Sequence, residues 1–274
     1  MGWFTETVTW VRTHLGGSAA PGAPAPRPTP TPAPAVPPGQ PSSVDALVAR
    51  MQEIDTTLPA DDGVADFNRM YLRVTELVRD RLVAGWFTNP VFVTRLDLVF
   101  AGLYLDAVDA ADPDPSWAPL FAARLEPGRV PIQFALAGMN AHINHDLPVA
   151  VVTTCRQLGL TPDSPGVEAD YQRVNDLLAG VQDEVRRSFL DGIALAVDER
   201  YAGPVADLVG GWSITRARDA AWTNARVLWS LDGAEPLRTE FLATLSRTVG
   251  MAGRYLLTPV ADLAPGGGSG SGPG

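Results

Sequence analysis

The sequence has 274 residues, of which 46% are hydrophobic, so it is long and apolar enough to bury a sizeable core. Its formal charge of −10 at pH 7 opposes non-specific attraction to nucleic acids and to anionic membrane surfaces, and we expect no nucleic-acid partner. All 21 basic residues are arginine. The absence of lysine excludes Schiff-base catalysis, a pyridoxal phosphate linkage and the lysine of a phosphate-binding P-loop. The single cysteine, Cys155, excludes an intramolecular disulfide and a cysteine-rich zinc site, and it favours a reducing, cytoplasmic compartment.

The first segment, residues 1–15, has apolar residues at helical spacing and is expected to form a short amphipathic helix. Polar residues interrupt it too early for a secretory signal, and no stretch of the sequence reaches the ~18 apolar residues of a membrane span. Residues 16–42 are expected to form a Pro/Ala-rich linker that cannot build a hydrophobic core. A spacer of this kind predicts that the helix docks on a protein partner or a membrane surface. The alternative is that the helix folds back on its own domain or frays.

Residues 43–263 are expected to form one all-α globular domain, a multi-helix bundle, because the turn and capping residues delimit helices and no strand alternation is found. Capping residues and Asn-Pro or Pro starts open the helices in chain order. The expected helices span about 43–58, 62–85, 90–110, 119–125, 131–159, 167–201, 211–231 and 235–257. The Gly/Ser-rich residues 264–274 are expected to form a flexible tail.

One expected helix is apolar on nearly every face but contains a polar cluster in its middle, made of Asn140, His142, Asn144, His145 and Asp146. Burying such groups without partners costs a few kcal/mol each, so they must be paired, hydrated or bound to a ligand. His142 and Asp146 are four residues apart and lie on one face, with His145 beside them. Asn140 and Asn144 form a second such pair, and they are our candidates for substrate binding.

Pro148 follows this cluster within the same helix. It removes the hydrogen bond to the carbonyl of Asn144, and it therefore kinks the helix or locally widens the turn. Side chains on a distorted buried helix suit a divalent metal ion held by His142 and Asp146, or an acid/base pair in which Asp146 orients a catalytic histidine, either His142 or His145. The alternatives are non-catalytic ligand binding and a satisfied polar network that only fixes the packing of the helices.

Two other helices place polar residues in apolar surroundings. Asp97 and Tyr104 are seven residues apart and share a face, and a carboxylate there needs an arginine or a metal as its partner. Arg218 shares a stripe with Trp222, and an arginine beside tryptophan can stack on an aromatic ring or clamp an anion. We take Asp97 and Arg218 as candidate catalytic residues, and Tyr104 and Trp222 as candidate substrate-binding residues. The competing interpretation is that Asp97 pairs with another helix and that Arg218 forms an interhelical ion pair.

Several runs of the sequence resemble an uncharacterised bacterial family that is catalogued as a domain of unknown function (family 5995). The resemblance covers about residues 44–257, and the runs that carry it are DGVADFNRMYL, FVTRLDLVFAGLYLDAV, FALAGMNAHINHDLPVAVV, VNDLL and WSITRARDAAW. It implies a helical fold and a cytoplasmic, bacterial setting. It implies no activity.

Two characterised all-α families share shorter motifs with the chain. His145-Asp146 resembles the dyad of the metal-dependent phosphohydrolases named for their adjacent His and Asp, but only His14 precedes His142 where that family has further histidine ligands. The segment NDLLAGVQDE is similar to the magnesium-binding segment of class I terpene cyclases, with Asn175 and Asp183 or Glu184 at ligand positions. It departs from that pattern at Ala179, where the pattern has a hydroxyl residue.

The residues together favour a small-molecule enzyme, with or without a divalent metal ion as cofactor, that uses the polar cluster on the distorted helix. In this hypothesis a small molecule is the partner that occupies the site. One alternative is a terpene-cyclase-like lyase acting on a prenyl diphosphate, for which an aromatic-rich α-bundle is physically suited. The other is a non-catalytic ligand-binding or partner-docking module in which the polar cluster is structural.

Overall fold

A computed structural model describes residues 41–178, 203 and 210–263 of the chain. The described residues form helices and loops, with no strand among them, as the all-α prediction requires. Residues 167–178 are also helical. The helices are α2 (Val44–Thr57), α3 (Gly63–Val83), α4 (Pro90–Asp109), α5 (Ala118–Ala123), α6 (Pro131–Ala141), η1 (His142–Asp146), α7 (Leu147–Leu158), α10 (Ile214–Ser230), α11 (Glu235–Leu256) and α12 (Val260–Leu263).

The predicted helix starts are confirmed by their caps. The Ser43 side chain accepts a hydrogen bond from the backbone N–H of Ala46 at 3.1 Å, and the Asp62 side chain accepts one from the N–H of Val64 at 2.8 Å. Asn89 caps α4 in the same way, with Pro90 in the first turn. These side chains satisfy backbone donors that a helix start leaves without partners, which is why the starts could be read from the sequence.

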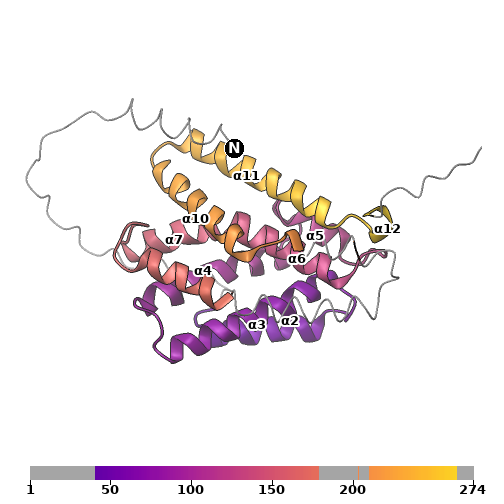
Figure 1. Ribbon diagram of the computed structural model, residues 1–274, viewed down its shortest axis with the longest axis horizontal. Coiled ribbons are helices and arrows are strands. Elements are labelled where there is room, and N and C mark those ends of the chain that lie inside the picture. The colour runs from indigo at the N-terminus through magenta and orange to yellow at the C-terminus, as the bar shows by residue number, and fades with distance from the viewer. Residues whose placement is uncertain (1–40, 179–202, 204–209, 264–274) are drawn as a thin grey trace, which may run out of the picture. The chain divides into compact units, whose positions relative to one another are not determined.

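The helices pack in three layers, which Figure 1 shows from the indigo start of the domain to its yellow end. Helices α2 and α3 lie side by side in one outer layer, and α10 and α11 lie in the other. Between them runs the continuous rod of α6, η1 and α7, with α4 alongside: α6 packs on α3 and α11, and α7 packs on α4 and α10. The rod is therefore covered on both sides, which explains its apolar character.

The middle of this rod is a π-helical turn. The backbone N–H of Leu147 donates to the carbonyl of His142, five residues earlier, and the wider turn spans His142–Asp146. Pro148 follows directly and has no N–H to continue the α-helical pattern. The predicted widening of the turn before Pro148 is thus confirmed, and such insertions in helices are frequent at functional sites.

A glycine permits the close packing of α6 on α3. A Cβ atom added to Gly138 would lie 2.2 Å from Cδ2 of Phe67, which is far inside a normal contact. Phe67 is 1% exposed and touches the rings of Tyr104 and Trp117 edge-on, so it is held within an aromatic core. The absence of a side chain at Gly138 sets the distance between these two helices.

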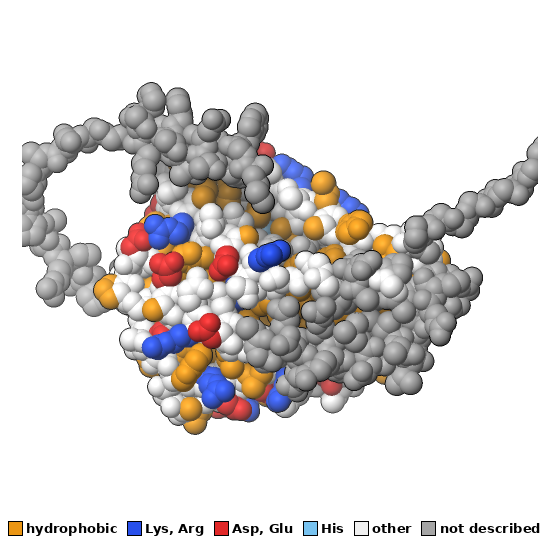
Figure 2. All heavy atoms as spheres, viewed as in Figure 1, with side chains coloured by type: hydrophobic (Ala, Val, Ile, Leu, Met, Phe, Trp, Pro, Cys, Tyr) orange, Lys and Arg blue, Asp and Glu red, His pale blue; other side chains and the backbone are white. Residues whose placement is uncertain are grey.

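The surface carries acidic and arginine side chains in a mixed pattern. Figure 2 shows red and blue side chains interspersed on the described part of one face, without a broad field of one sign. None of the described helices combines the length and the apolar character that a membrane crossing needs. The predicted amphipathic helix, linker and Gly/Ser tail lie outside the described residues, except for the end of the linker at residues 41 and 42.

Candidate functional site

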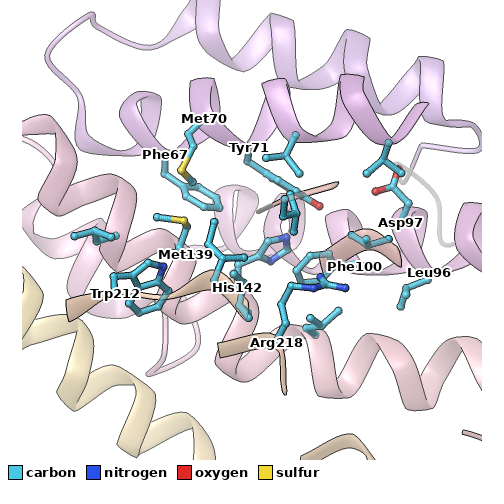
Figure 3. Close-up of a pocket in the computed structure, with 18 of the residues that line it drawn as sticks. Phe67, Met70, Tyr71, Leu96, Asp97, Phe100, Met139, His142, Trp212 and Arg218 are labelled. Carbon is cyan, nitrogen blue, oxygen red and sulfur yellow. The ribbon is translucent and has the colours of Figure 1, made fainter. Parts of the chain in front are cut away.

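A cavity of about 110 Å³ lies where the π-helical turn faces helices α3, α4 and α10. We call it the central cavity. Most of its wall is aliphatic, aromatic or thioether, and Figure 3 shows Phe67, Met139 and Trp212 near one end of it. Five residues with polar side-chain groups also line it, and they come from segments far apart in the chain: Tyr71, Asp97, His142, Trp212 and Arg218. An apolar pocket with a few convergent polar groups is the usual form of a small-molecule site.

His142 supplies an acceptor atom that has no partner. Its Nδ1 lies 3.1 Å from Oδ2 of Asp146, whereas its buried Nε2 has no hydrogen-bond partner among the described residues. Burial lowers the pKa of His142 in spite of the hydrogen bond to Asp146 and the negative charge there. The imidazole is therefore neutral at pH 7, and because a carboxylate only accepts, the proton is on Nδ1. Nε2 is left with a free lone pair in the wall of the cavity.

Asp146 is held in place from three directions. Besides His142, the indole Nε1 of Trp117 donates to its Oδ2 at 3.0 Å, and Nδ1 of His145 lies 2.8 Å from its Oδ1. Burial by itself would raise the pKa of Asp146, but the hydrogen bonds from His142 and His145 and the positive charge that His145 carries when protonated hold the pKa below its ordinary value. Asp146 is thus an ionised carboxylate that orients His142, as the acid/base hypothesis requires.

His145 is not part of the wall of the central cavity. Its Nε2 lies 3.8 Å from Oδ1 of Asp114, an oxygen that also accepts hydrogen bonds from the hydroxyl groups of Ser116 and Ser246. Burial opposes protonation of His145, yet the hydrogen bond to Asp146 and the charges of Asp146 and Asp114 raise its pKa above the ordinary value. Of the two histidines in the cluster, the geometry therefore selects His142 as the one able to meet a ligand.

Asp97 lies in the cavity wall without the cation that the sequence led us to expect. Among the described residues, its buried Oδ2 has no hydrogen-bond partner and the carboxylate forms no ion pair with an arginine. Burial raises the pKa of Asp97 to about 7. At neutral pH this carboxyl group is therefore present in both protonation states, and its protonated form is a proton donor inside the cavity.

Arg218 is buried, with only 4% of its surface exposed, and it lines the cavity. Its guanidinium donates to Oδ1 of Asn175 and, at 3.2 Å, to the carbonyl of Tyr171, and it lies over the Tyr171 ring at 4.4 Å. These partners are neutral. The interhelical ion pair that we considered is not found among the described residues, and burial lowers the pKa of Arg218.

Sequence reasoning missed two residues of the cavity wall. The hydroxyl group of Tyr71 and the indole N–H of Trp212 are buried and have no hydrogen-bond partner in the described part of the protein. Tyr71 also touches the ring of His142, with centroids 4.5 Å apart. Spacing did not reveal Tyr71, because a tyrosine on the apolar face of a helix has the pattern of a core residue. Trp212 was expected near the start of the helix 211–231, but α10 begins at Ile214, so helical spacing did not give the position of its side chain.

Four predicted substrate-binding residues lie outside the cavity wall. The Asn140 amide donates to the carbonyl of Val249 and accepts from Asn144, so this pair ties the rod to α11. Tyr104 donates to Oδ1 of Asn68 in the core, and Trp222 packs against Tyr171 with ring centroids 4.6 Å apart. These residues support the helices around the site rather than face a ligand in the central cavity.

Metal binding by the polar cluster would need ligand atoms that are not already hydrogen-bonded. The predicted ligands His142 and Asp146 face each other, and both oxygens of Asp146 already meet N–H groups. Within the described residues, no three His, Cys, Asp or Glu side chains gather as a metal site would require. The described residues therefore do not fit a metal centre.

The segment that is similar to the magnesium-binding segment of terpene cyclases is described only in part. Its Asn175 accepts a hydrogen bond from Arg218, whereas the positions from Ala179 to Glu184 lie outside the described residues.

Comparison with known proteins places the chain in a family without identifying an activity. No curated protein and no solved structure matches the chain. A family described as "Family of unknown function (DUF5995)" matches residues 44–259, which include every residue of the cavity wall named above. The match also agrees with the limits expected from the sequence. The chain therefore belongs to the DUF5995 family of unknown function.

Proposed function

We propose that the protein is an enzyme that acts on a small, mostly apolar molecule in the central cavity, with His142 as the general base. The observation that carries this proposal is the state of the His142 ring: Nδ1 is bonded to an ionised carboxylate, and Nε2 is unprotonated, buried and without a partner in the cavity wall. A buried acceptor without a partner is costly, and binding sites commonly account for such exceptions.

The proposed step is a proton transfer. Nε2 of His142 takes a proton from a bound water or from an acidic bond of the substrate, so that the bond to hydrogen breaks and an N–H bond forms. The resulting imidazolium is stabilised by Asp146, which is a positioning residue. Asp97, in its protonated form, returns a proton at another point of the substrate. The hydroxyl group of Tyr71 is free to donate a hydrogen bond to an oxygen on which negative charge develops.

The test is conversion of a panel of benzene-sized esters, epoxides and ketones, followed by proton NMR in D₂O. We expect His142→Gln to lower the rate by about 10²–10⁴-fold, the usual contribution of a general base. His145→Gln is the matched control, because it also removes a histidine bonded to Asp146 but one outside the cavity wall. The control is expected to keep its rate within a few-fold.

The pH profile of conversion provides an independent readout. The base must be neutral, so the rate rises with pH through the pKa of His142, which burial places below 6.5. The acid must be protonated, so the rate falls as pH rises through the pKa of Asp97, near 7. Compounds that bind in the cavity but remain unconverted at every pH would contradict catalysis. They would favour the non-catalytic ligand-binding alternative.

We also propose a cellular location for the protein. We place the protein in the bacterial cytoplasm, supported by Cys155, which is free and buried and so remains reduced without cost to the fold. The docking of the N-terminal helix on a partner or membrane surface also remains a proposal, since that segment lies outside the described residues.

A further inference from the structure

The charge of Arg218 is not balanced by any carboxylate that the structure places against it. Its described partners are an amide oxygen, a backbone carbonyl and an aromatic ring. Asp219, the next residue in α10, raises the pKa of Arg218 by its charge, but it is exposed and forms no ion pair with Arg218. Asp97, in the same cavity wall, forms no ion pair with Arg218 either. A buried charge without a counterion costs several kcal/mol, so such an arginine calls for an anion.

The wall of the central cavity contains hydrogen-bond donors that no acceptor among the described residues binds. The N–H of Trp212 and the hydroxyl group of Tyr71 are buried without a partner in the described part of the chain, and Arg218 lines the same cavity. Figure 3 shows Arg218 between Trp212 at one end and Asp97 at the other. Two neutral donors and one cation suit a single negative charge with more than one acceptor atom.

The size and wall of the cavity limit the rest of the ligand. Its volume of about 110 Å³ is smaller than the roughly 150 Å³ of an engineered apolar cavity that holds benzene, so the apolar body of the ligand can be no larger than one benzene ring. The wall beyond the polar groups is apolar, including Phe67, Met139 and Phe100. A dianion such as a phosphate monoester would bring a second charge into this wall without a second cation to balance it, so a carboxylate fits better.

We propose that the central cavity binds a monoanionic carboxylate with an apolar body no larger than a benzene ring, whose carboxylate group is bound by Arg218. This inference rests on the proposed function in that it names the substrate class of the same cavity. The body lies against the aromatic and thioether wall, which brings its carbon atoms next to Nε2 of His142.

Phenylacetate is the probe, and its neutral analogue phenylacetamide and the cationic 2-phenylethylamine are the comparisons. Affinities are measured by calorimetry on the full chain. We expect phenylacetate to bind at least tenfold more tightly than phenylacetamide, and 2-phenylethylamine to bind weakest, because Arg218 attracts the anion and repels the cation. Equal affinities, a preference for the amide or the amine, or no binding of any of the three would overturn the proposal.

Substitutions test whether Arg218 is the arginine that binds the carboxylate group. Arg218→Gln is expected to remove the preference for phenylacetate, whereas Arg216→Gln, which changes an exposed arginine of the same helix, keeps it. Arg218→Met serves as a second variant if the glutamine variant does not fold, because it fills a similar volume without a charge. A preference that survives in a folded Arg218 variant would contradict the assignment.

The outcomes separate this inference from the proposed catalysis. His142→Gln is expected to keep the preference for phenylacetate over phenylacetamide, since His142 is not the anion-binding group and its loss affects both compounds alike. If the anion preference is absent but neutral compounds are converted in a His142-dependent manner, catalysis stands and the substrate class is wrong. If phenylacetate is preferred and no carboxylate is converted, the cavity binds the proposed class of ligand and the proposed catalysis is wrong.

Discussion

The ring of Phe100 lies flat against the imidazole of His142, with centroids 3.5 Å apart and planes within 5° of each other. The stack restricts rotation of the imidazole, and the contact between Nδ1 and Asp146 fixes which edge of the ring faces the carboxylate. The direction of Nε2 is therefore determined before any ligand binds. Preorganisation of this kind is what a general base needs, because the geometry does not have to be created during the reaction.

Asp146→Asn is expected to destabilise the protein by at least about 2 kcal/mol. Asp146 accepts from Trp117, His142 and His145, and an amide replaces one of its acceptor oxygens by an NH₂ group that faces another donor. The free energy of unfolding is measured by urea denaturation.

The matched control is Asp163→Asn. Asp163 pairs with Arg226 at 2.6 Å, but its side chain is 71% exposed, so the change in stability should stay within about 1 kcal/mol. A loss in Asp146→Asn no larger than in this control would show that Asp146 does not anchor the cluster.

Asp97→Asn is expected to stabilise the protein, by an amount that depends on pH. The folded state raises the pKa of Asp97 from the model-peptide value of 3.8 to about 7, so folding binds a proton between these two values. The wild type therefore loses stability as pH rises from about 4 to about 7, and the asparagine variant does not. The gain should be near zero at pH 4 and reach its full size above pH 7.

Urea denaturation at pH 4, 5.5 and 8 measures this difference. Asp109→Asn, an exposed carboxylate at the end of the same helix, is the control and should show no comparable trend. A gain that is the same at all three pH values would mean that folding does not raise the pKa of Asp97.

Gly138→Ala is expected to destabilise the protein by about 1–3 kcal/mol, the usual cost of overpacking a core. The new Cβ atom would lie 2.2 Å from Cδ2 of Phe67 and 2.9 Å from its Cβ, so the helices α3 and α6 would have to separate. This cost outweighs the roughly 1 kcal/mol by which alanine favours a helix over glycine.

Gly253→Ala in α11 is the control for helix propensity. A Cβ atom there would lie 3.5 Å from the nearest atom, in Pro119, which is an ordinary contact, so the substitution should be neutral or stabilising. Thermal or urea denaturation of both variants checks the prediction. Equal effects of the two substitutions would contradict the close approach of Phe67 to Gly138.

The polar cluster was predictable in part, because its members are close in sequence. Four-residue spacing placed His142 against Asp146, and the contact between Nδ1 and Oδ2 confirms it. Spacing did not show that Trp117 also binds Asp146, or that His145 turns toward Asp114, since those partners come from other segments. The direction in which each histidine points depends on neighbours that local pattern does not specify.

The amino-acid sequence by itself determined the helices, their starts and the widened turn before Pro148, because caps, apolar periodicity and the missing proline N–H act within a few residues. Only the tertiary structure decided which polar groups share a cavity. Tyr71, Asp97, His142, Trp212 and Arg218 come together through the packing of separate segments. That the first four have polar atoms without a partner among the described residues becomes visible only when their neighbours are known. Whether a buried polar group has a hydrogen-bond partner depends on its three-dimensional surroundings, so it cannot be predicted from residue spacing in the sequence.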